Sequence, residues 1–175
     1  MTIEPARLRA KWGWTALLSL VPFAVMGWLD SIVKGVAEVG ILDLQFAGTA
    51  EKTAEILGAW TAAGVVPHVA FSLGLDYLFM VLFGAAFFYA ALVAREAYPS
   101  LRGPLTLAAW AGPAAALLDA LENAIHTGMV LGLCDPECVA IQYPVTLAKW
   151  ALVVVGLVVS VIALTGLRRL KRAAS

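Results

Sequence analysis

Four polar side chains lie at helical spacing inside an otherwise apolar stretch of the sequence. They are Asp119, Glu122, Asn123 and His126. Positions i, i+3, i+4 and i+7 share one face of an α-helix, so all four side chains project to the same side. Ionisable groups are costly to bury in a membrane, and they normally face a bundle interior or a wet cavity. This face is the leading candidate site, with Asp119, Glu122 and His126 as acid/base candidates and Asn123 as a ligand contact.

The other apolar segments carry polar side chains that reach a similar depth. The carboxylates of Asp76, Asp119 and Glu122 then face one obvious cation, Lys149. Two negative charges therefore stay uncompensated. A low-dielectric interior answers by protonating a carboxyl group, by charging a histidine, or by admitting a cation or a cationic ligand. Each answer predicts a different function. The further candidates are Asp76 as an acid or base, and Asp30, Ser72, Tyr77 and Lys149 as ligand contacts.

The function favoured by this pattern is the binding of a small amphiphilic or cationic ligand in a site that opens toward the outer side. A protonated carboxyl group beside a histidine could also transfer a proton, which leaves open whether the protein is an enzyme. One alternative is a proton- or cation-coupled transporter. Four helices make a small transporter, so this alternative requires an oligomer such as a homodimer, which Gly128 and Gly132 could pair through a GxxxG surface.

Two further alternatives stay open. A metal ion could be held by His68, Glu122 and His126, since two histidines and a carboxylate form a known ligand set, and haem between the two histidines is sterically conceivable. No motif assigns a particular cofactor. The polar residues could instead form a hydrogen-bond network that fixes helix register, although such bonds contribute only about 0.6 kcal/mol each in membranes.

Composition places the chain in a membrane. Apolar residues make up 62% of the 175 positions and charged residues 14%, which is more apolar surface than a soluble domain of this length could bury. We predict an all-α, polytopic membrane protein in which residues 1–175 form a single four-transmembrane-helix bundle in the lipid bilayer. Residue runs long enough to cross a bilayer, at about 20 residues each, are 12–29, 66–94, 104–132 and 141–167.

Basic residues gather beside one side of the predicted bundle. They precede the first span, lie between the second and third, and follow the fourth. The positive-inside rule therefore predicts a multi-pass protein of a cytoplasmic-type membrane, inner or plasma, with both termini cytoplasmic. No long basic run suggests nucleic-acid binding. The basic residues on this side are Arg7, Arg9, Lys11, Arg95, Arg102, Arg168, Arg169, Lys171 and Arg172.

The outer-side segment, residues 30–65, is longer than a simple connection needs, so it should have structure of its own. Thr49 can cap a helix with Glu51 in its first turn. Ile56 and Trp60 recur at helical spacing, which predicts an amphipathic interfacial helix. We favour a structural belt over the bundle, with a moving lid as the alternative.

Cys134 and Cys138 lie in the short outer loop between the third and fourth spans. On the oxidising side of a membrane the expected state is a local disulfide. A redox-active role is the alternative. It is less favoured because the spacing is C-x3-C and the sequence has no second pair to relay electrons.

Overall fold

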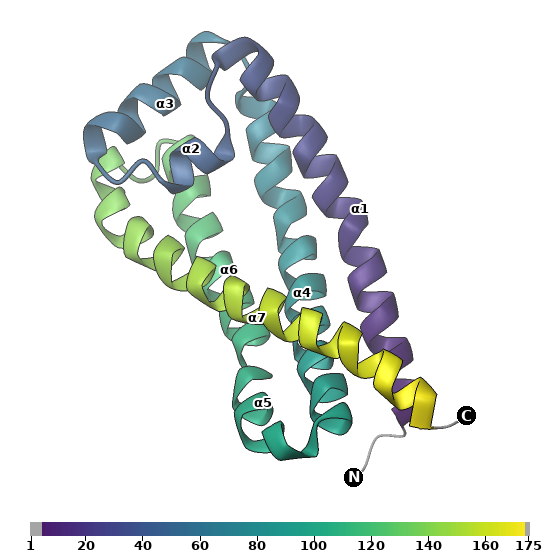
Figure 1. Ribbon diagram of the computed structural model, residues 1–175. Coiled ribbons are helices and arrows are strands. Elements are labelled where there is room, and N and C mark those ends of the chain that lie inside the picture. The colour runs from purple at the N-terminus through teal and green to yellow at the C-terminus, as the bar shows by residue number, and fades with distance from the viewer. Residues whose placement is uncertain (1–4, 174–175) are drawn as a thin grey trace. The chain divides into compact units, whose positions relative to one another are not determined.

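The computed structural model describes the backbone of residues 5–173 and the side chains of residues 6–167, and every regular element in that range is helical (Figure 1). This confirms the all-α prediction. The long helices are α1 (Pro5–Ala37), α4 (Val66–Ala97), α6 (Ala111–Val130) and α7 (Val139–Ala173). The short elements are α2 (Ile41–Gln45), α3 (Ala50–Ala62), η1 (Pro99–Leu101), α5 (Arg102–Ala108) and η2 (Pro136–Cys138).

Four segments are long and apolar enough to cross a membrane, which confirms the four-span prediction. They carry many exposed apolar side chains, including Leu107 and Leu117, which are 78% and 74% exposed. Such side chains suit contact with lipid. The candidate spans are Ala6–Ala37, Val66–Ala97, Pro99–Val130 and Pro136–Leu167.

Two spans differ in detail from the sequence prediction. The first helix continues to Ala37 instead of ending at residue 29, so it takes in the start of the predicted outer segment. The third span is divided, because α5 ends at Ala108 and α6 begins at Ala111. Pro113 lies in the first turn of α6, where its missing N–H leaves no helical hydrogen bond unmade.

The chain divides into two compact units, and each contains parts of the same four long helices. The first unit consists of Met1–Leu20, Met80–Leu117 and Lys149–Ser175. Its core is built from small residues of α4 packed with side chains of α1, α5 and α7. The main members of this core are Leu8, Trp12, Ala90, Ala94, Leu105, Val159 and Ala163.

The second unit consists of Val21–Phe79 and Leu118–Ala148, and it contains the outer segment. Ile56 and Trp60 of α3 are fully buried, whereas Glu51, Lys52 and Glu55 on the same helix are exposed. This confirms that α3 is amphipathic. Its buried face packs with Leu44 of α2 and with α1 and α4 side chains, and Trp60 Nε1 donates a 2.9 Å hydrogen bond to the Val39 carbonyl.

The start of α3 is stabilised by local hydrogen bonds. Thr49 Oγ1 accepts from the Lys52 N–H at 3.2 Å, as the predicted cap requires. The exposed Glu51 carboxylate accepts hydrogen bonds from its own backbone N–H and from Thr49, and these hold its pKa below the ordinary value of 4.5.

Replacing Glu51 by glutamine is expected to change how stability depends on pH. Because the folded-state pKa is lowered, the contribution of Glu51 is fully present above pH 4.5 and is lost as pH falls through the folded pKa. The stability difference between the wild type and Glu51→Gln should therefore be constant above this pH and shrink below it. Denaturation curves of both proteins in lipid nanodiscs at a series of pH values measure this. A difference that grows on acidification would contradict the assignment.

A charged clasp ties the end of α1 to α2, and we define it as Asp30, Lys34 and Asp43. Asp30 Oδ1 accepts from the Ile41 N–H at 2.8 Å, and Asp43 Oδ2 accepts from the Gly40 N–H at 2.7 Å. Lys34 Nζ lies 3.7 Å from Asp30 and 3.6 Å from Asp43. A side chain at Gly40 would collide with the Asp30 carboxylate, so the clasp requires glycine there.

The Gly40→Ala substitution should therefore destabilise the second unit by roughly 1–3 kcal/mol, the usual range for inserting a methyl group into packed structure. Gly35→Ala is the matched control, because a Cβ at that α1 position meets nothing within 4 Å. Thermal unfolding followed by circular dichroism compares the two variants. Equal melting temperatures would show that the clasp side chains can move aside without loss of stability, which would contradict the requirement for glycine.

Candidate functional site

The polar face predicted on the third span is buried. Glu122, Asn123 and His126 of α6 are 0% exposed, and Asp119 is 4% exposed. The spacing alone placed them on one helical face, and their burial confirms that this face points into the protein. Burial of ionisable groups to this degree is costly, so their surroundings have to supply polar partners.

Glu122 is joined to α7 through two buried polar side chains. Its Oε1 accepts a hydrogen bond from Thr146 Oγ1 and lies 3.3 Å from Gln142 Nε2. Gln142 Nε2 also lies 2.5 Å from Thr146 Oγ1 and donates at 3.0 Å to the backbone carbonyl of Gln45, the last residue of α2. The second unit thus brings α2, α6 and α7 together around one carboxylate.

Asn123 makes the corresponding link to α4. Its Nδ2 donates a 2.7 Å hydrogen bond to Asp76 Oδ2. Asp76 and Asn123 were both predicted for the site, and the structure brings them into direct contact. We define the polar cluster as Asp76, Asp119, Glu122, Asn123, His126, Gln142 and Thr146.

Two amide oxygens in the polar cluster have no hydrogen-bond partner among the described residues. These are Asn123 Oδ1 and Gln142 Oε1, which belong to side chains with no exposed surface. The orientation of each amide follows from the group that its nitrogen faces. Asn123 Nδ2 faces a carboxylate oxygen and Gln142 Nε2 faces a backbone carbonyl, and both of these acceptors require an N–H donor. A buried acceptor without a donor costs about 1–3 kcal/mol. The cluster therefore holds acceptors that a bound donor would satisfy.

Other predicted site residues lie elsewhere. His68 is exposed in the first turn of α4, and Tyr77 is 42% exposed. Ser72 on the same helix is half-buried. Asp30 belongs to the clasp, where its carboxylate caps the start of α2.

The predicted metal ligands do not form a compact set. Within the range whose side chains are described, no group of three or more His, Cys, Asp or Glu residues is placed to hold a metal ion. His68 is exposed, whereas Glu122 and His126 are fully buried.

Lys149 follows Thr146 by three residues on α7 and is described with the first unit. It is 4% exposed, which confirms the expected burial, and its Nζ lies 5.6 Å from the centre of the Trp150 ring. An ammonium group at that distance from an indole is stabilised by a cation–π interaction.

Gln142 and the backbone carbonyl of Gln45 take part in the hydrogen bonds around Glu122, although the sequence analysis assigns neither of them a site role. Gln142 and Thr146 share the helical stripe of Lys149 at i, i+4 and i+7, so the spacing contained a signal for them. Gln45 contributes a main-chain carbonyl, which no side-chain pattern reveals.

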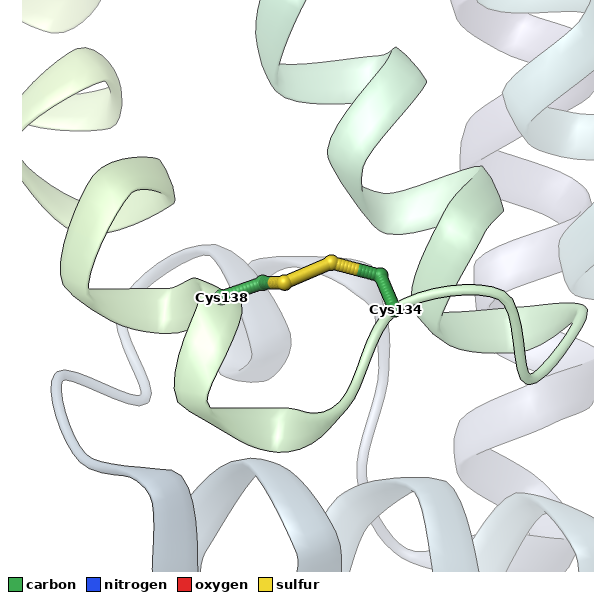
Figure 2. The surroundings of a disulfide bond; sticks show 2 residues. All are labelled: Cys134 and Cys138. Carbon is green, nitrogen blue, oxygen red and sulfur yellow. A yellow bond between two sulfur atoms is a disulfide. The ribbon is translucent and has the colours of Figure 1, made fainter.

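The local disulfide between Cys134 and Cys138 is confirmed, with 6.3 Å between their Cα atoms (Figure 2). It closes the turn that connects α6 to α7. Gly132 has a φ of 68° in this turn, a conformation that favours glycine. Gly128, the other glycine of the predicted GxxxG surface, faces Cys134, whose Cβ would lie 3.2 Å from a Cβ added to the glycine.

We expect Cys134→Ser to lower the free energy of unfolding by about 2 kcal/mol, the loop-closure entropy for so short a ring. Because the turn positions α6 against the start of α7, the loss should be local to the second unit. Denaturation of the variant, and of wild type with and without dithiothreitol, measures it. Reduced wild type should match the variant, whereas unchanged stability in both would contradict a structural role.

Charge is divided unevenly between the two units. The residue ranges of the second unit contain ten acidic and two basic residues, whereas those of the first contain two acidic and ten basic residues. Both basic residues of the second unit lie beside carboxylates, Lys34 in the clasp and Lys52 at 2.9 Å from Glu55. The zero net charge of the chain thus conceals a strongly acidic unit around the polar cluster.

Comparisons with protein-family models, with characterised proteins and with solved structures found no match for this chain.

Proposed function

We propose that the polar cluster binds the head group of a small cationic amphiphile that donates hydrogen bonds. The observation that carries this proposal is the pair of buried amide oxygens, on Asn123 and Gln142, that have no donor. They lie beside the carboxylates of Asp76 and Glu122, which are hydrogen-bond acceptors when ionised. A protonated amine supplies both the charge and the N–H donors that such a set of acceptors requires.

The acidic character of the second unit supports the same ligand class. The residue ranges of the second unit contain ten acidic and two basic residues, and the exposed acidic side chains among them raise the local concentration of cations. The apolar residues of the spans suit the hydrocarbon part of an amphiphile, because most of a small-molecule site is normally apolar with a few polar groups that fix orientation.

Two alkyl probes of equal chain length test the proposed head group. Dodecylammonium carries three N–H donors, whereas dodecyltrimethylammonium carries the same charge and none. Because buried acceptors discriminate strongly against an analogue that cannot donate, dodecylammonium should bind at least about ten-fold more tightly. Native mass spectrometry of the protein in nanodiscs measures both affinities. Equal affinities, or preference for the trimethylated probe, would contradict the proposal.

We also propose that the segment containing α2 and α3 and the turn between α6 and α7 lie on the outer side of a cytoplasmic-type membrane, and that both termini are cytoplasmic. The division of charge between the units supports this, since cytoplasmic segments carry the excess of Lys and Arg. A C-terminal green fluorescent protein fusion should fluoresce, and alkaline phosphatase inserted after Asp135 should be active. The reverse pattern would overturn the orientation.

A further inference from the structure

One end of the first unit concentrates basic side chains from three helices. We define this basic end as Arg7, Arg9, Lys11, Arg95 and Arg102. The shared core brings them to one region, since Leu8, Ala94 and Leu105 belong to the same hydrophobic cluster. Arg7 and Arg9 flank Leu8 on α1, Arg95 follows Ala94 on α4, and Arg102 precedes Leu105 by one turn of α5.

The residue ranges of the first unit contain few acidic residues beside the basic ones. Among the residues of this unit whose side chains are described, only Glu96 is acidic. Its Oε1 lies 3.6 Å from Arg95 Nη2. Arg9, Lys11 and Arg102 are exposed. Lys11 Nζ lies 5.6 Å from the centre of the Tyr89 ring, a contact that leaves the ammonium charge in place.

Arg95 provides the most specific feature of this end. Its Nε is buried and makes no hydrogen bond, although its side chain is 30% exposed. A guanidinium group binds phosphate through parallel N–H donors, so an anion at the exposed edge of Arg95 would meet the accessible N–H donors of the guanidinium and its charge.

Exposed apolar side chains of the same unit favour a lipid phosphate over a free phosphate ion. Trp14, Leu107 and Trp110 in the same unit are 63%, 78% and 64% exposed. These apolar and indole side chains suit acyl chains and the headgroup boundary, which free phosphate would not use. We propose that the basic end binds the head group of an anionic phospholipid. This site is separate from the polar cluster and does not depend on the function proposed for it.

Native mass spectrometry of the full chain tests this, using micelles with equal amounts of phosphatidylglycerol and phosphatidylcholine. Each basic residue near an anionic lipid surface contributes about a five-fold factor in binding. Wild type should therefore retain phosphatidylglycerol in clear preference, and Arg95→Gln and Lys11→Gln should each reduce that preference about five-fold. Lys52→Gln is the control, because it removes an exposed basic residue from the second unit.

Three outcomes would overturn the proposal. The first is equal retention of the two lipids by wild type. The second is a loss in Lys52→Gln as large as that in Arg95→Gln, since this would indicate a general charge effect. The third is displacement of phosphatidylglycerol by inorganic phosphate, which would show that the basic end recognises phosphate without the lipid.

Discussion

Replacing Glu122 by glutamine should weaken dodecylammonium binding by about 100-fold or more. The substitution keeps an Oε1 acceptor for Thr146 and Gln142 but removes the charge that faces the proposed ammonium group. Removing one partner of a buried ion pair typically costs 3–5 kcal/mol, which corresponds to more than 100-fold in affinity. The unliganded variant should be at least as stable as wild type, because it no longer buries a carboxylate.

Glu137→Gln is the matched control for this prediction. Glu137 lies in η2 of the same unit, undergoes the same chemical change and is exposed, so binding should be unaffected. Titration of both variants with dodecylammonium, together with their thermal unfolding, separates loss of binding from loss of folding. Full affinity in Glu122→Gln would remove this residue from the site.

The largest effect on stability is expected from Trp60→Ala. Trp60 of α3 is fully buried and packs with side chains of α1 and α4. Its Nε1 donates a hydrogen bond to the Val39 carbonyl. Truncation of a buried tryptophan to alanine costs about 3–5 kcal/mol, since it leaves a cavity and an unsatisfied carbonyl. Trp60→Phe should cost less because the ring volume is largely kept.

Trp14→Ala provides the comparison, because Trp14 is 63% exposed and its loss opens no cavity. Its effect should stay within about 1 kcal/mol. Chemical denaturation in micelles measures the free energies of unfolding of Trp60→Ala, Trp60→Phe and Trp14→Ala. If Trp60→Ala were as stable as Trp14→Ala, the outer segment would not be packed on α1 and α4 as described.

The helical face of α6 could be predicted because it depends on local spacing alone. Asp119, Glu122, Asn123 and His126 recur with the period of a helix inside an apolar run, and neither feature needs tertiary information. The cap at Thr49 and the disulfide between Cys134 and Cys138 were predictable for the same reason, since each joins residues only a few positions apart.

Features that depend on distant parts of the chain could not be predicted in this way. α2 has five residues, too few to show a helical period, and Asp30 meets its first N–H across eleven positions of chain. The position of Asp30 at the end of an apolar run predicts a ligand contact, and nothing local in the sequence indicates its hydrogen bond to Ile41. The contact of Gln142 with the Gln45 carbonyl spans 97 positions and involves main chain, so no composition or spacing indicates it.

The most direct test of the proposed cation-binding site is native mass spectrometry of the protein extracted gently from its own membrane. We expect one bound molecule per chain, carrying an amine and a hydrocarbon part, and we expect it to be absent from Glu122→Gln prepared in parallel. Wild type that carries no such molecule, or a Glu122→Gln variant that retains it equally, would contradict the proposed function.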